Sequence, residues 1–69
     1  MPKKIPIEDV RPGVCMRAFG VTVLVVEFAN GVALVDDLHG ERRECCLRDR
    51  RFVLWRSVVD FMREEPGAA

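Results

Sequence analysis

The chain has 69 residues, 49% of them hydrophobic and 32% charged, and its eleven basic and eleven acidic residues cancel at neutral pH. A chain this short forms a single domain, 1–69, which needs support from disulfides, a metal or oligomerisation because its own core is small. No apolar run approaches the ~20 residues that cross a bilayer, which argues against a membrane protein. Zero net charge gives no broad attraction to nucleic acid or lipid, so any such role must depend on local clusters.

Three cysteines are an odd number and too few for a disulfide framework. The opening MPKKIPIEDV also lacks the apolar core of a signal peptide. We therefore expect a cytoplasmic protein with reduced thiols.

The first segment, 1–11, shows neither a helical nor a strand period, and it carries Pro2 and Pro6. We predict an extended arm that ends in the turn Arg11-Pro12-Gly13. Residues 14–19 follow as a first short strand, at the start of a predicted sheet over 14–48.

The stretch VTVLVVEF, residues 21–28, is apolar at both odd and even positions, so it predicts a strand with two faces to cover. Asn30-Gly31 favours a type I′ turn and closes a hairpin. The expected cross-strand pairs are Ala29 with Val32, Phe28 with Ala33, Glu27 with Leu34, Val26 with Val35, and Val25 with Asp36.

A second turn is expected at His39-Gly40, which pairs Asp37 with Arg42 and Asp36 with Arg43. Two opposite-charge pairs support this register, because a shift by one residue would displace both.

This register separates two faces of the sheet. The predicted core face carries Val21, Val23, Val25, Ala29, Val32, Leu34, Leu38, Cys45 and Leu47. The opposite face carries Leu24, Val26, Phe28, Ala33, Val35 and Cys46, among polar residues. Burial of a side chain of this size is worth roughly 1.5 to 3 kcal/mol, so we expect a partner chain to cover the second face. The alternative is a sheet curled tightly enough to hide both faces within one monomer.

Helical spacing begins at Phe52 and predicts an amphipathic helix over 50–65, with Asp49 as N-cap and Pro66-Gly67 ending it before the tail 66–69. Its apolar half carries Phe52, Leu54, Trp55, Val58, Val59, Phe61 and Met62. The predicted fold class is therefore α+β: a small antiparallel sheet of four to five strands, or an SH3-like barrel, followed by one C-terminal helix. If the helix packs on the sheet, Trp55 is at least half buried.

The turn at 11–13, the long bent strand, the Asn-Gly hairpin and the charged hairpin with Gly40-Glu41 together resemble small SH3-like barrels of bacterial regulatory and nucleic-acid-associated proteins. The resemblance covers residues 7–51 and concerns the fold, and the C-terminal helix departs from the minimal barrel. Members of that class bind RNA, DNA or peptides, so the resemblance implies a binding module and assigns no site residue.

Residues that could carry catalysis or bind a metal are few. His39 and the three cysteines suggest zinc, but Cys45 and Cys46 are neighbours on a strand and point to opposite faces. The cysteines are better explained as small buried hydrophobes, and Asp36 and Asp37 have arginine partners. We expect no enzyme activity, no cofactor and no metal.

Arginine concentrates in segment 41–51, where Arg48, Arg50 and Arg51, with Lys3 and Lys4, are candidates for phosphate binding. Against nucleic-acid binding, acidic residues dilute this segment and no exposed aromatic residue is evident for base stacking.

Two hypotheses remain. The leading one is a non-catalytic interaction module, a homodimer or higher homo-oligomer, that also binds another protein. Its candidate self-association residues are Leu24, Val26, Phe28, Val35, Trp55, Val59 and Met62. The alternative is a small nucleic-acid-binding regulator that uses the five cations named above.

Overall fold

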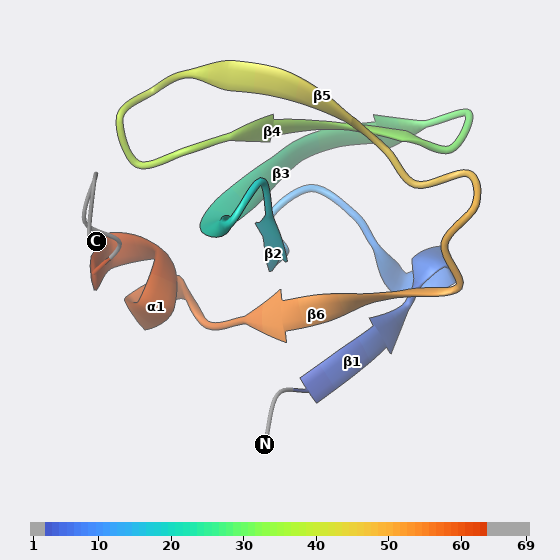
Figure 1. The fold of residues 1–69 in the computed structure, drawn as a ribbon, viewed down its shortest axis with the longest axis horizontal. Coiled ribbons are helices and arrows are strands. Elements are labelled where there is room, and N and C mark those ends of the chain that lie inside the picture. The colour runs from blue at the N-terminus through green and yellow to red at the C-terminus, as the bar shows by residue number, and fades with distance from the viewer. Residues whose placement is uncertain (1–2, 64–69) are drawn as a thin grey trace.

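The computed structural model describes residues 3–63 and contains one antiparallel sheet of six strands (Figure 1). The elements in chain order are β1 (Lys3–Pro6), the 3-10 helix η1 (Ile7–Asp9), β2 (Cys15–Ala18), β3 (Val21–Ala29), β4 (Val32–Asp36), β5 (Arg42–Cys46), β6 (Phe52–Arg56) and α1 (Val58–Arg63). The α+β class is confirmed, with six strands where four or five were expected.

The strands lie in the order β1-β6-β2-β3-β4-β5. Strands β2 to β5 follow one another through hairpins, and the chain then returns to place β6 against β2, with β1 outside it (Figure 1). The sheet is curled, and β3, β4 and β5 lie above β6 and β1. It does not close, because β5 and β1 are its edges. This arrangement is compatible with an SH3-like fold.

The predicted extended arm over 1–11 is wrong for residues 3–9, which form β1 and η1. Ile7 donates its N–H to the Arg51 carbonyl at 3.1 Å, which extends the pairing of β1 with β6. Hydrogen-bonded and non-bonded pairs alternate in an antiparallel ladder, so Pro6 occupies a non-bonded position. Its missing N–H therefore costs this ladder nothing. Met1 and Pro2 lie outside the described residues.

The Asn30-Gly31 turn is confirmed, since both residues have positive φ, 53° and 77°. A second turn of the same kind joins β2 to β3, where Phe19 and Gly20 have φ of 56° and 77° between the paired residues Ala18 and Val21. The sequence did not predict this turn, because phenylalanine is not a residue that favours positive φ.

The predicted β3–β4 register holds next to the turn and fails beyond it. Three pairs are as expected, but a β-bulge between Val25 and Glu27 then shifts the ladder. Val25 therefore pairs with Val35, and Leu24 pairs with Asp36, in place of the predicted Val26–Val35 and Val25–Asp36 pairs. A bulge inserts one residue into a strand, so it reverses which residues of β3 face the core.

The predicted β4–β5 register is wrong by one residue. Asp36 pairs with Arg42, and the Arg42 Nε donates to the Asp36 carboxylate at 2.7 Å. The Asp37 carboxylate instead accepts the backbone N–H groups of His39 and Glu41, each at 2.9 Å, and so closes the loop. An aspartate that satisfies its own turn in this way is a common alternative to a cross-strand ion pair.

The core lies inside the curl of the sheet, and the bulge explains why it differs from the predicted face. Val25, Val35 and Ala33 are all nearly inaccessible. The buried core cluster is Val10, Met16, Val23, Val25, Ala33, Val35, Leu47 and Val53. Two residues assigned to the core face, Val32 and Leu34, are only partly buried.

The outer face of β2 and β3 is also covered within the chain. Cys15 and Thr22, which share that face, are each 2% exposed. α1 contacts β3, and the negative charge of Asp60 on α1 acts on the Cys15 thiol. Both faces of the apolar strand are therefore covered here, one by the curl of the sheet and the other beside α1.

The predicted helix over 50–65 is wrong for most of its length. Phe52–Arg56 forms β6, a strand of the β-favouring residues Phe-Val-Leu-Trp held between β1 and β2. Within the described residues α1 covers Val58–Arg63, and Ser57 caps it in place of Asp49. The Asp60 N–H donates to Ser57 Oγ and the Ser57 N–H donates to the Asp60 carboxylate, both at 3.0 Å. Residues 64–65 of the predicted helix and the tail 66–69 lie outside the described residues.

Candidate functional site

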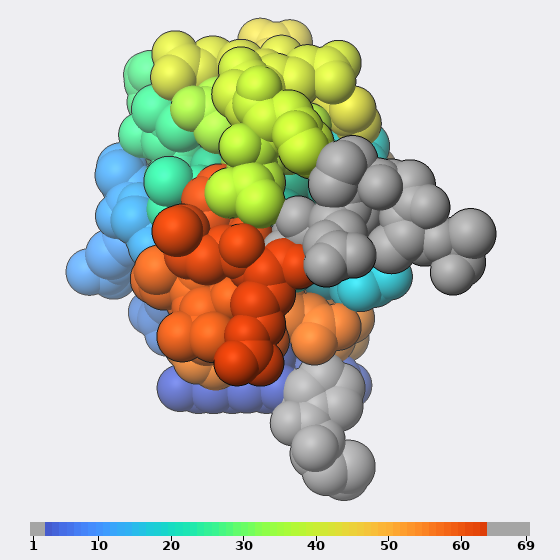
Figure 2. Space-filling model, turned by 90° about the vertical axis from the view of Figure 1, so that its left-hand side faces the viewer, coloured from blue at the N-terminus to red at the C-terminus, as the bar shows by residue number. Residues whose placement is uncertain are grey.

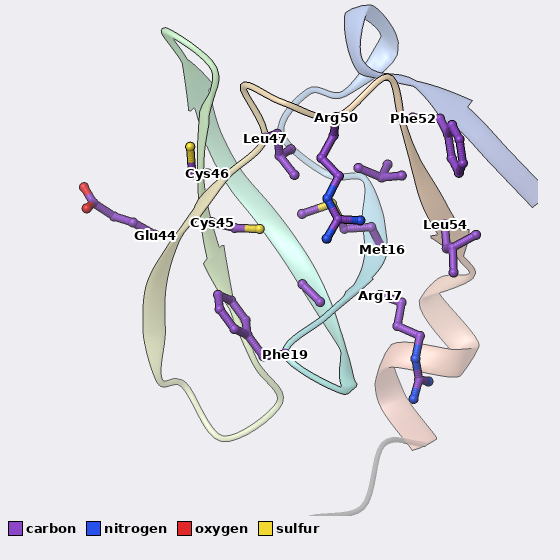
Figure 3. Close-up of a pocket in the computed structure, with 12 residues that line it drawn as sticks. Met16, Arg17, Phe19, Glu44, Cys45, Cys46, Leu47, Arg50, Phe52 and Leu54 are labelled. Carbon is purple, nitrogen blue, oxygen red and sulfur yellow. The ribbon is translucent and has the colours of Figure 1, made fainter.

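A groove of about 310 Å³ opens where the sheet fails to close, between β5 on one side and β2 and β6 on the other (Figure 3). Its floor is formed by core side chains, and its rim carries charged and aromatic ones. The residues that line it are Met16, Arg17, Ala18, Phe19, Glu44, Cys45, Cys46, Leu47, Arg50, Phe52, Val53 and Leu54.

Two strand edges border this groove. β2 and β6 pair only through Cys15–Arg56 and Met16–Trp55, so Arg17 and Leu54, the next residues along, pair with β3 and β1 but not with each other. β5 has β4 on one side and no strand on the other within residues 3–63. The groove thus lies between main-chain edges as well as side chains.

One cationic side chain enters the groove. In Figure 3, Arg50 extends from the β5–β6 loop across the groove, Cys45 points into it and Glu44 points away from it. Arg17 borders the opposite wall, but its side chain points away from Arg50 toward α1 and donates to the Gly20 carbonyl at 3.3 Å. The groove therefore presents one guanidinium group above an apolar floor.

Phe19 at the rim has an unusual backbone conformation for its type. Its φ is 56°, its side chain is 51% exposed, and the Arg43 guanidinium lies 5.1 Å from the ring centre. A bulky residue with positive φ is strained, and such strain is often found at functional sites.

The three cysteines differ in accessibility. Cys15 is buried, Cys45 is partly buried and Cys46 is exposed, and all three are free thiols. Burial raises the pKa of the Cys45 thiol, while the positive charge of Arg50 acts in the opposite direction. In the part of the chain that the structure describes, no three His, Cys, Asp or Glu side chains lie close enough to hold a metal ion.

The five predicted phosphate-binding cations do not form one cluster. Lys3 lies over the ring of Trp55 at 5.3 Å, and Lys4 lies over the ring of Phe52 at 4.5 Å. Since neighbours on a strand point to opposite faces, the two lysines lie on opposite faces of β1.

The three arginines of that set also have separate environments. The Arg48 Nε donates to the Asn30 carbonyl at 3.1 Å, Arg50 crosses the groove, and Arg51 is exposed next to β6. The expectation that no aromatic residue is exposed is wrong, because Phe19, Phe52 and Trp55 are 51%, 43% and 37% exposed.

The predicted self-association residues are likewise separated. Val35 is in the core and offers no surface, and Leu24, Val26 and Phe28 are partly buried. Trp55 has more than half of its surface covered, as expected, but by neighbouring strands and not by a helix.

The remaining two predicted residues lie on α1, on the side of the molecule shown in Figure 2. Val59 and Met62 are 57% and 64% exposed, and Val58, which the sequence analysis did not select, is 61% exposed. We call Val58, Val59 and Met62 the α1 stripe. The Ser57-x-x-Asp60 capping signature is the signal that would have located this helix and its exposed face.

The fold and the groove define a small antiparallel β domain, compatible with an SH3-like fold, with an open sheet and one short C-terminal helix. Comparisons with protein-family models, curated proteins and solved structures find no match. Among the described residues, no helix is long and apolar enough to cross a membrane.

Proposed function

We propose that this protein is a non-catalytic interaction module that self-associates through the α1 stripe. The observation that carries the proposal is the exposure of three large apolar side chains, each by more than half, on a helix of six residues. Val58, Val59 and Met62 fall within about 100° of the helix circumference at 100° per residue, so they form one continuous surface.

The exposed apolar area supports a weak dimer. Complete burial of a Val or Met side chain is worth roughly 1.5 to 3 kcal/mol, and each of the three is more than half exposed. A two-fold dimer would bury two stripes, for a gain of about 6 to 10 kcal/mol, against an association cost of at least about 4 kcal/mol. The net gain is about 2 to 6 kcal/mol, so we expect a dissociation constant on the order of 1 mM.

The chemistry of the most buried thiol supports a non-catalytic role. Cys15 is 2% exposed, and burial, followed by the negative charge of Asp60, raises the pKa of its thiol. The reactive thiolate is therefore disfavoured at neutral pH. The single histidine, His39, lies exposed in the β4–β5 loop.

Sedimentation velocity over a concentration series tests the proposal. The wild-type protein should show a rising sedimentation coefficient, and Met62→Glu should remain monomeric because a dimer would bury its charge. Ala29→Glu, which adds the same single negative charge at the exposed end of β3 beside the Asn30-Gly31 turn, is the matched control and should still associate. Monomeric wild-type protein at 1 mM, or equal behaviour of the two variants, would refute the proposal.

Nucleic-acid binding is the second candidate, favoured by the pairing of each exposed aromatic ring with a cation. It ranks second because those cations occupy ring faces that bases would need and the positive charges are dispersed. A labelled single-stranded oligonucleotide should bind at low salt and be released steeply as salt rises. Absence of binding at low salt would eliminate this candidate.

A further inference from the structure

We infer that the groove binds an extended acidic peptide, which pairs antiparallel with β5 and places one apolar side chain over the groove floor. This site is separate from the α1 stripe, so the inference does not depend on self-association. It names a second partner class, a peptide, and a second mode of binding, the addition of a strand to a sheet edge.

The hydrogen-bonding pattern of β5 supports strand addition. Asp37 donates to the Glu41 carbonyl at 3.0 Å and Leu47 donates to the Gly31 carbonyl at 2.7 Å, so the odd-numbered residues of β5 bond to β4. Main-chain groups of the alternate residues, Arg42, Glu44 and Cys46, therefore point away from β4.

The outward-pointing main chain of β5 reaches the groove. Glu44 and Cys46 line it, although the Glu44 side chain points away from it in Figure 3. Side chains of a strand alternate between faces, so Cys46 shares the outer face with Glu44. These two residues thus contribute main chain to the groove wall, which is what an added strand requires.

The opposite wall of the groove, formed by β6, also presents main-chain groups to the groove. The Ile7–Arg51 hydrogen bond directs the odd-numbered residues of β6 toward β1, so Phe52 and Leu54 present their main-chain groups on the groove side. Only Arg56, farther along, finds a partner there, in Cys15. The groove is therefore a place where the curled sheet presents unpaired main-chain groups on two facing walls.

The charge and depth of the groove specify the side chains of the ligand. Met16, Leu47 and Val53 form an apolar floor, and a volume of about 310 Å³ accommodates an apolar side chain with its neighbouring main chain. The Arg50 guanidinium extends across the groove above this floor. A peptide with one apolar residue and a carboxylate two positions away on the same face matches this arrangement.

A peptide fits these observations better than a nucleic acid does. Unpaired strand edges offer alternating N–H and C=O groups, which peptide main chain complements and a phosphate backbone does not. The Phe19 and Phe52 rings at the rim already carry Arg43 and Lys4 on a face. Stacking of bases on these rings would first have to displace those cations.

The test uses the peptide acetyl-Glu-Thr-Val-Thr-Glu-amide, titrated into ¹⁵N-labelled protein and followed by NMR. We expect binding with a dissociation constant between about 0.1 and 1 mM, with shifts in the amides of β5. The matched peptide acetyl-Lys-Thr-Val-Thr-Lys-amide should bind at least 10-fold more weakly. In a Cys46→Ser variant, the acidic peptide should also slow alkylation of Cys45, which points into the groove.

The strand register predicts which peptide amides form hydrogen bonds with β5. In an antiparallel pair, directly opposed residues share a face, so the threonines lie opposite the outward-facing residues of β5 and make the hydrogen bonds. N-methylation of both threonines should weaken binding at least 10-fold, whereas N-methylation of the valine should change it less than 2-fold. Equal effects of the two methylations would overturn strand addition.

Variants separate the charge requirement from folding. Arg50→Gln should weaken binding about 3- to 10-fold, and Arg17→Gln, whose side chain points away from the groove, is the control that should leave it unchanged. The amide spectrum away from the groove reports whether each variant is folded. Unchanged affinity in the Arg50→Gln variant, or no binding at 5 mM peptide, would overturn the inference.

Other occupants are distinguishable in the same samples. A single-stranded dT12 that shifts the same amides more strongly than the peptide would assign the groove to nucleic acid. Dissociation of a dimer by the peptide, seen by sedimentation, would assign the β5 edge to a second copy of the chain. Either result would overturn the inference without affecting the α1 stripe, which Met62→Glu tests independently.

Discussion

Replacement of Gly31 by alanine tests how tightly the β3–β4 turn packs against the chain beyond β5. Gly31 has φ of 77°, and a Cβ built there would lie 2.5 Å from the Cγ of Arg48. Gly40 in the next loop has φ of 80°, but a Cβ there meets nothing within 4 Å. The two glycines thus share a conformation and differ in their surroundings.

This difference gives a worked magnitude. A non-glycine residue in the left-handed region costs about 1 to 2 kcal/mol, a cost that Gly31→Ala and Gly40→Ala share. At Gly31 the Arg48 side chain must also move, which breaks its 3.1 Å hydrogen bond to the Asn30 carbonyl. An exposed bond of this kind contributes about 1 kcal/mol, so we expect Gly31→Ala to destabilise the protein by about 2 to 3 kcal/mol and Gly40→Ala by 1 kcal/mol less.

Urea denaturation followed by Trp55 fluorescence measures both changes. The slope for a domain of this size is about 1 kcal/mol per M, so the midpoints of the two variants should differ by about 1 M. Introduction of Gly31→Ala into an Arg48→Ala background removes the obstructing Cγ, and its cost there should fall to that of Gly40→Ala. The same cost in both backgrounds would refute the packing of Arg48 on the turn.

Three further predictions follow from the same structure. Phe19→Asn should stabilise the protein by about 0.5 to 1 kcal/mol in urea denaturation, because Asn-Gly adopts the positive φ angles of this turn more easily than Phe-Gly. The same change should weaken peptide binding, because it removes a ring from the rim of the groove. Destabilisation of the protein would contradict the argument that Phe19 is strained. Iodoacetamide should label Cys46 rapidly and Cys15 only on unfolding, as mass spectrometry would show. The hydrogen bond from Arg42 holds the pKa of Asp36 below its ordinary range. The pair therefore stabilises the fold fully above about pH 3.9, and this stabilisation is lost as the pH falls through the lowered pKa. Asp36→Asn should remove this pH dependence and so flatten the acid limb of the stability curve.

Local sequence signals predicted the Asn30-Gly31 turn and the strand pairs next to it. Asn30-Gly31 placed a hairpin correctly, because those residues adopt positive φ at low cost. The pairs next to it also followed, since a two-residue turn fixes them directly. Farther from the turn the predictions failed at the bulge, where Val25 and Val35 gain burial together at the expense of one unpaired residue.

The C-terminal segment shows why periodicity alone misled. Phe52, Leu54 and Trp55 fit a helical face, but the same residues favour strands, and the free edges of β1 and β2 offered β6 a partner on each side. Ser57 and Asp60 then began the actual helix. Choice between the two structures depended on which strand edges were available, and that information is not local.

The candidate site was beyond sequence reasoning for the same reason. Arg17, Phe19, Cys45 and Arg50 come from three separate segments, and nothing in their spacing brings them together. The amino-acid sequence by itself determined the β-rich character of the domain, its Asn-Gly hairpin and its surplus of apolar residues. Only the tertiary structure decided the bulge, the return of β6 and the unclosed edge that forms the groove, because each depends on pairing between residues distant in the chain.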